Sequence, residues 1–279
     1  MGCNVAAMSR FCLLAVCFLL GSLASSAEPD ARLRRLVTAD DARGWEAVGR
    51  LDLVGQGFCT GTLISPDLVL TAAHCVYDGK TGRRIEPGNI RFLAGYRQGR
   101  AVAIRRARRV VVEEGYVFDD PDKTRRVAAD LALVELDQPI AESVARPFKW
   151  TRKPEKGDPV VIVSYAEDRE TSPALQEPCY MLGEQRRIFV LTCSVTFGAS
   201  GSPIMTRNGP RPRIASVISS MAQINGRNVA LGTALGEPLE RLLAELENTS
   251  PVFQNAKGRT GTIARQLGLR GSGIRFIRP

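Results

Sequence analysis

Short apolar stretches separated by turn residues run through most of the chain. Between residues 45 and 136 these stretches are AVGRLDLV, CTGTLIS, LVLTAAH, IRFLAG, AVAIR, VVV and LALVEL, and between residues 160 and 235 they are VVIVSYA, RIFVLTCSV, SPIMT, RIASVISS and VALGTAL. β-branched residues are frequent within them, and Gly, Pro, Asn and Asp recur between them at close intervals. The pattern predicts an all-β barrel or sandwich.

Two segments depart from this pattern. Residues 148–159, FKWTRKPEKGDP, are polar and carry two prolines, and we expect them to cross between two halves of the protein. Residues 237–247, EPLERLLAELE, have leucines at helical spacing, which predicts a C-terminal helix packed on the second half. Those leucines are Leu239, Leu242, Leu243 and Leu246.

The first 27 residues are predicted to be a signal peptide. Arg10 precedes the apolar run FCLLAVCFLLG, and small residues, Ser25 among them, suit cleavage after Ala27. The run is too short for a convincing transmembrane helix. A lipoprotein site at Cys17 is the weaker interpretation, because valine precedes it where a small residue is expected. We therefore expect a secreted or periplasmic protein, with residues 28–35 as a leader or short propeptide.

Export changes how the cysteines are interpreted. Removal of the signal peptide leaves four of the seven cysteines, an even set in a compartment where disulfides persist. They are Cys59, Cys75, Cys179 and Cys193. Four cysteines allow three pairings, and the sequence alone does not choose among them. A short-range pairing, of the first two and of the last two, would connect neighbouring hairpins.

The formal net charge of +9 raises the question of nucleic-acid binding. After Glu247 the chain has no acidic residue, and residues 248–279 predict a disordered basic tail that is weakly attracted to anionic surfaces. The basic run AIRRARRV at 103–110 is interpreted as the solvated face of a strand. No zinc, helix-turn-helix or aromatic RNA-binding signature is present, so we expect no specific nucleic-acid partner.

Three separated residues could together form a nucleophilic site. Ser200 lies between glycines in FGASGSP, and a serine hydroxyl needs a neighbouring base to become a strong nucleophile. The one histidine, His74, ends an apolar run in LVLTAAHC and is the candidate base. Asp130, at the start of the apolar run LALVEL, is the candidate for a buried carboxylate that orients the imidazole. The other nearby carboxylates, of Asp119, Asp120 and Asp122, belong to a polar loop and are expected to be solvated.

The motifs TAAHC, DLALVEL and GASGSP, in that order, resemble the trypsin-like (chymotrypsin-fold) serine proteases from about Val37 to Leu246. GASGSP lacks an acidic residue before the serine. In this respect the chain is closest to the bacterial glutamyl-endopeptidase-like branch. The resemblance implies a protease domain over residues 36–247, with two six-stranded antiparallel β-barrels at about 36–150 and 158–236. It also implies a Cys59–Cys75 disulfide beside the histidine, and we expect Cys179–Cys193 with it.

The roles of the site residues follow from the same resemblance. Ser200 would form an acyl-enzyme, His74 would act as base and then acid, and Asp130 would orient His74. The backbone N–H groups of Gly198 and Ser200 would form the oxyanion hole. No metal or cofactor is needed, and proteins or peptides are the expected substrates. The alternatives are an inactive protease-like binding module and an esterase that uses the same triad. The oligomeric state is not predicted.

Two positions depart from better-known relatives, and three others are expected to shape the substrate pocket. Ala199 replaces the aspartate that animal trypsins pair with a newly formed N-terminus, so that activation route is not available. Ile218 occupies the place of the substrate-binding histidine of glutamate-specific relatives. Ser194 and Val195 are expected to line the primary pocket without charge, so we expect cleavage after uncharged, small or apolar residues. Ser219 is expected to support the buried aspartate and the substrate strand.

Overall fold

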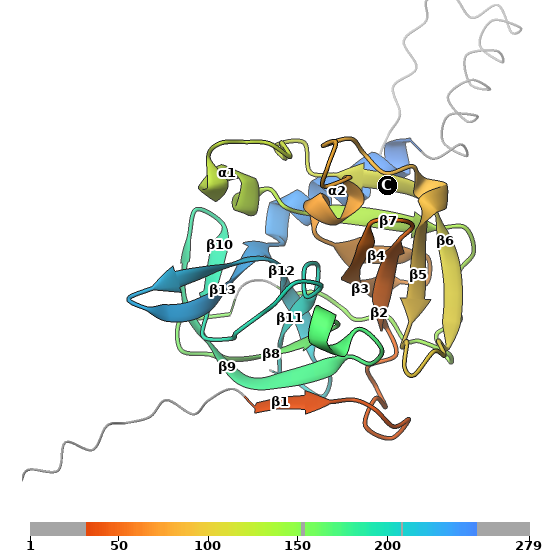
Figure 1. The fold of residues 1–279 in the computed structure, drawn as a ribbon, viewed down its shortest axis with the longest axis horizontal. Coiled ribbons are helices and arrows are strands. Elements are labelled where there is room, and N and C mark those ends of the chain that lie inside the picture. The colour runs from red at the N-terminus through yellow and green to blue at the C-terminus, as the bar shows by residue number, and fades with distance from the viewer. Residues whose placement is uncertain (1–31, 152–153, 208, 250–279) are drawn as a thin grey trace, which may run out of the picture. The chain divides into compact units, whose positions relative to one another are not determined.

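The computed structural model describes residues 32–151, 154–207 and 209–249 (Figure 1). Six strands of the first half close into an antiparallel barrel in the order β2-β3-β4-β7-β6-β5. These strands are β2 (Val48–Leu53), β3 (Gly57–Ser65), β4 (Leu68–Thr71), β5 (Ile90–Ala94), β6 (Ala103–Val112) and β7 (Ala132–Leu136). The expected stretch VVV and the last three residues of AVAIR are parts of the single strand β6, because the arginines between them continue the same ladder.

Six strands of the second half form the other barrel, which β8 closes by pairing with both β9 and β11. They are β8 (Pro159–Ser164), β9 (Ala174–Gln185), β10 (Ile188–Leu191), β11 (Pro203–Thr206), β12 (Arg213–Ile224) and β13 (Arg227–Ala234). The predicted pair of six-stranded antiparallel barrels is confirmed.

A further strand, β1 (Arg32–Arg35), adds to the second barrel by pairing with residues 174–177 of β9. It lies in the segment expected to be a leader or propeptide. Leu36 follows it directly, is fully buried and donates its backbone N–H to the carbonyl of Pro173 at 2.8 Å. In this structure residues 32–36 are therefore integrated into the barrel.

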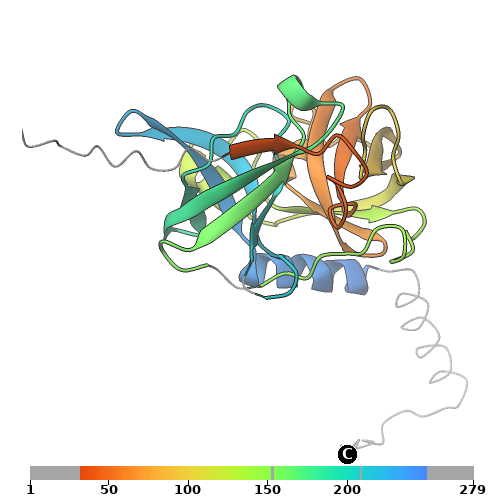
Figure 2. The same ribbon diagram turned by 90° about the horizontal axis from the view of Figure 1, so that it is seen from below.

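Short helices complete the fold. They are η1 (Ala73–Val76), η2 (Pro87–Asn89), α1 (Lys123–Ala128), η3 (Glu167–Arg169) and α2 (Gly236–Asn248). Helix α2, blue in Figure 2, buries Leu239, Leu242 and Leu246, as their spacing predicts. The expected packing partner differs, because Arg109 of β6 in the first barrel donates to the carbonyl of Leu246 at 2.9 Å. The helix thus contacts the first half as well as continuing from the second.

The predicted signal peptide (1–27) and nearly all of the predicted basic tail (248–279) lie outside the described residues. Within the residues described, no helix has the length and apolar character needed to cross a membrane.

Candidate active site

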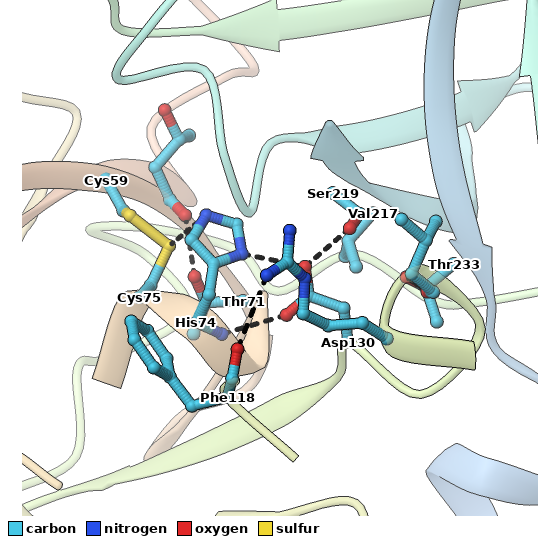
Figure 3. Close-up of polar contacts among 12 residues, drawn as sticks. Cys59, Thr71, His74, Cys75, Phe118, Asp130, Val217, Ser219 and Thr233 are labelled. Atoms are coloured by element: carbon cyan, nitrogen blue, oxygen red, sulfur yellow. Dashed lines mark hydrogen bonds and ion pairs between the residues drawn. A yellow bond between two sulfur atoms is a disulfide. The ribbon is translucent and has the colours of Figure 1, made fainter. Parts of the chain in front are cut away.

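His74 lies on the short helix η1, directly after strand β4. Its neighbours Ala73 and Cys75 are buried, and Cys75 forms a disulfide with Cys59 of β3 (Figure 3). The second disulfide joins Cys179 to Cys193, so the structure has the short-range pairing. The first disulfide fixes the segment that carries the imidazole to the neighbouring strand of the same barrel.

Asp130 lies between helix α1 and strand β7, and its side chain is only 3% exposed. Its Oδ1 accepts the backbone N–H of His74 at 2.8 Å, and its Oδ2 contacts Nδ1 of the His74 imidazole at 2.7 Å. The hydroxyl of Ser219 on β12 donates to Oδ2 at 2.5 Å (Figure 3). A buried carboxylate is stabilised by such donors, and here they come from both barrels.

Other aspartates near α1 serve the local fold. Asp122 caps α1 by accepting the backbone N–H groups of Thr124 and Arg125. Asp120 was expected to be solvated, but it is 8% exposed and pairs with Arg125 at 2.7 Å. The ion pair compensates the cost of burying that carboxylate.

The environment of His74 moves its pKa in two directions. Burial lowers the pKa of the imidazole, because a charged group loses solvation. The charge of Asp130 and its hydrogen bond oppose this, and together they raise the pKa of His74 above its ordinary value, while the charge of Arg126 lowers it. With Nδ1 turned toward Asp130, Nε2 is the nitrogen left to exchange a proton with another group.

Ser200 follows a turn in the second half of the chain that Gly198 makes possible. Gly198 has φ +89°, and a Cβ atom there would lie 2.6 Å from the ring of Phe58 and 2.9 Å from Cα of Ala166. The Thr60 hydroxyl donates to the carbonyl of Gly198 at 3.1 Å. This position therefore needs glycine both for its backbone conformation and for its space.

The N–H groups of Gly198 and Ser200 remain available. The neighbouring N–H groups of Ala199 and Gly201 donate to the carbonyls of Thr196 and Ile218. In the described part of the chain, those of Gly198 and Ser200 donate to no acceptor. Two free donors beside a serine hydroxyl are what an oxyanion hole requires.

Ser200, His74 and Asp130 line one groove of about 430 Å³, which we call the active-site groove. Its first wall comes from the first barrel and α1 and consists of His74, Tyr116, Phe118, Arg126, Val127 and Asp130. Its second wall consists of residues 195–197, Ser200 and residues 218–221 of β12. In the described part of the chain, the Ser200 hydroxyl makes no hydrogen bond to His74. In serine hydrolases without substrate, the hydrogen bond between serine and histidine is often long and shortens only when substrate binds.

A family model described as a trypsin-like peptidase domain matches residues 59–210, more than half of the chain. The chain belongs to the trypsin-like peptidase family. The match includes His74, Asp130 and Ser200 and both disulfides.

Individual relatives agree with this family. A glutamyl endopeptidase of Bacillus licheniformis is 24% identical over 176 residues, which are 61% of this chain and 52% of the relative. The chain spans about half or less of the length of the curated relatives it matches.

Two solved structures share the fold. A Glu endopeptidase in complex with MPD has a TM-score of 0.64 at 19% identity, covering 79% of this chain and 98% of that one. A scabies mite inactivated protease paralogue has a TM-score of 0.58 at 14% identity, covering 73% and 93%.

Three of the four expected pocket residues line the groove of this trypsin-like chain. Val195, Ile218 and Ser219 do so, and the first two are almost fully buried. Ser194 is exposed and does not line the groove. Sequence reasoning missed the aromatic rim at Phe197, which is 74% exposed, and the cation of Arg126.

Cys59, His74 and Cys75 bring three possible metal ligands within 4.8 Å of one another. Both sulfur atoms are bonded to each other, however, so neither is a thiolate. A metal would need the thiolate form, and the group does not suit one.

Proposed function

We propose that this chain is an exported serine endopeptidase that hydrolyses peptide bonds through an acyl-enzyme on Ser200. The observation that carries the proposal is the contact of His74 Nδ1 with Asp130 Oδ2, in a groove that Ser200 also lines. The contact holds the imidazole in the tautomer that presents an unprotonated Nε2 as a base. The two disulfides are consistent with an oxidising compartment.

The proposed reaction has two halves. Oγ of Ser200 attacks the substrate carbonyl carbon while Nε2 of His74 takes its proton, and the N–H groups of Gly198 and Ser200 hold the oxyanion. His74 then gives that proton to the departing amine, the C–N bond breaks, and an ester remains on Ser200. Water repeats the sequence: His74 takes a proton from water, the ester is cleaved, and the proton returns to Ser200.

The primary pocket favours uncharged side chains. Val195 and Ile218 present hydrocarbon to the groove, and an ionised side chain placed against them would lose solvation without a partner. The name of the Bacillus relative indicates glutamate for that protein. A glutamate at this position would need a cation beside Val195 or Ile218, and neither residue supplies one.

A peptide library and a simple ester, each incubated with the mature protein and with a Ser200→Ala variant, test the proposal. We expect the wild type alone to cleave peptides, after uncharged small or apolar residues. Ester turnover without peptide turnover would indicate an esterase. A profile dominated by one charged residue would refute the proposed specificity.

An inactive binding module is the second candidate, because a mite paralogue with the same fold is described as inactivated. A folded protein with both disulfides formed that turns over neither peptide nor ester would favour this candidate. The retained His74–Asp130 contact argues against it, because a binding module has no need of an oriented imidazole.

A further inference from the structure

Helix α1 places two consecutive arginines in different surroundings. Asp122 caps the helix through the N–H groups of Thr124 and Arg125, at 2.9 and 3.2 Å, which fixes where the helix begins. Arg125 then pairs with Asp120 at 2.7 Å. Arg126 instead lines the active-site groove. Of these two arginines, Arg125 is thus neutralised locally, and Arg126 lines the groove.

Arg126 has no acidic partner among residues 32–151, 154–207 and 209–249. Its Nη1 donates to the carbonyl of Phe118 at 3.4 Å, a long contact to a neutral group. Of the described side chains that line the groove, it is the only lysine or arginine. A half-buried guanidinium that keeps several donors free is a ready partner for a carboxylate.

The surroundings of Arg126 strengthen such a contact. Tyr116, Phe118 and Val127 line the same wall of the groove and limit the access of water to a bound peptide. Electrostatic attraction increases as solvent is displaced. The formal net charge of +9 also favours the approach of acidic peptides.

Strand β12 on the second wall determines how a peptide can lie in the groove. β12 pairs with β11 only as far as Val217, while β13 occupies its other edge as far as Ile224. The edge of residues 219–221 that faces away from β13 therefore has no strand partner in the described chain. An extended peptide can add to such an edge through its backbone.

In such an extended peptide, two adjacent side chains enter different parts of the groove. Successive side chains of an extended strand point to opposite sides. When the residue that supplies the scissile carbonyl occupies the pocket of Val195 and Ile218, the preceding residue points to the first wall. His74, Arg126 and Val127 line that wall.

We propose that Arg126 is a specificity-determining residue that selects Asp or Glu at the position immediately before the residue with the scissile carbonyl. The inference rests on the proposed function, because it takes the groove to be the substrate groove. It adds a second requirement to that function: an uncharged side chain in the primary pocket and an acidic one beside it.

Two peptides that differ only in Glu or Gln at this position test the inference. We would measure kcat/KM with the wild type, and the Kd of fluorescently labelled peptides with the Ser200→Ala variant, which needs no turnover. We expect a preference for Glu of about 2- to 5-fold, the range of a partly exposed ion pair. Arg126→Gln should abolish the preference, and Arg126→Glu should reverse it.

Arg125→Gln is the matched control, because it removes a positive charge one residue away that does not line the groove. It should leave the preference intact. Equal values for both peptides with the wild type, or a preference that survives in Arg126→Gln, would overturn the inference. Cleavage of both peptides without preference would leave the proposed function standing. Absence of cleavage, with Glu selected in the binding measurement, would overturn the proposed function and the cleavage-site part of the inference, and would leave Arg126 as a residue that selects an acidic side chain in a bound, uncleaved peptide.

Discussion

The backbone N–H of Thr60 on β3 donates to the carbonyl of Ser200 at 2.9 Å, which fastens the loop of the proposed nucleophile to the first barrel. Thr60 is fully buried, and its hydroxyl also donates to the carbonyl of Gly198 at 3.1 Å. The N–H of Tyr165 in turn donates to that hydroxyl at 3.0 Å. One threonine thus holds the carbonyls of Gly198 and Ser200, whose peptide groups alternate along the chain with the two that carry the free N–H groups.

Gly201→Ala should disrupt this connection. A Cβ atom at Gly201 would lie 2.2 Å from Oγ1 of Thr71 and 2.3 Å from the carbonyl oxygen of Thr60, and φ is +76°. We expect the free energy of unfolding to fall by about 2–4 kcal/mol, and activity to fall with it because Ser200 moves. Denaturant unfolding and peptide hydrolysis measure the two effects.

Gly226→Ala is the control for backbone strain alone. Gly226 has φ +77° but nothing lies within 4 Å of its Cβ position. The Gly226→Ala substitution should lower the free energy of unfolding by about 1 kcal/mol, and activity should be retained. Equal losses of stability and activity in Gly201→Ala and Gly226→Ala would show that the clash with Thr60 and Thr71 is not the cause of the effect at Gly201.

Ser219→Ala should weaken catalysis without unfolding the protein. The variant removes the donor at 2.5 Å from Oδ2 of Asp130, and a hydrogen bond to a charged group contributes about 1.5–3 kcal/mol. We expect kcat/KM to fall about 10-fold. Ser220→Ala, in the same groove but without a side-chain hydrogen bond in the described chain, should leave kcat/KM near the wild-type value. A Ser219→Ala enzyme with unchanged kinetics would refute the supporting role.

In a plot of kcat/KM against pH, the midpoint of the loss of activity on the acid side should lie above the ordinary pKa of histidine. In the proposed mechanism only neutral His74 can take the proton of Ser200, so activity should fall as the pH drops through the pKa of His74. Because Asp130 raises that pKa above 6.5 despite burial, the midpoint of kcat/KM against pH should exceed 6.5. An active enzyme with a midpoint below 6.5 would contradict the account.

Asp130→Asn should move the acid-side midpoint of kcat/KM toward lower pH, since the variant removes the negative charge that raises the pKa of His74. It should also lower kcat/KM by about 10²- to 10⁴-fold, the contribution of a well-placed acid–base group. A variant that keeps the wild-type rate at high pH would show that Asp130 does not orient His74.

Removing the Cys59–Cys75 disulfide should reduce both stability and activity. The bond closes a loop with a sequence separation of 16 residues, which corresponds to about 3 kcal/mol of unfolding free energy. The double Ala variant should also lose turnover, because Cys75 adjoins His74. Replacing Cys179 and Cys193, whose separation is 14 residues, gives a loop of similar size that does not carry His74. If turnover falls equally in both double variants, the disulfide beside His74 has no special role in positioning it.

The sequence predicted the elements whose signal is local, and it missed those set by tertiary contacts. Strands in which most residues are apolar, such as β7, were identified because that pattern is dense. Strand β9, ALQEPCYMLGEQ, was missed because its proline and polar residues interrupt that pattern. β1 has one apolar residue among three arginines and becomes a strand through its pairing with β9.

The candidate site divides in the same way. His74, Asp130 and Ser200 stand in recognisable motifs. Arg126 does not, because its direction depends on the six-residue helix α1, which is too short to show periodicity. The Asp122 cap was the available signal for that helix.

Labelling of the mature protein by a fluorophosphonate probe tests the central claim most directly, because the probe reacts only with a serine whose proton can be removed. We predict labelling of the wild type and its loss in both Ser200→Ala and His74→Ala. No labelling of a folded protein with both disulfides formed, or labelling that survives in Ser200→Ala, would contradict the account.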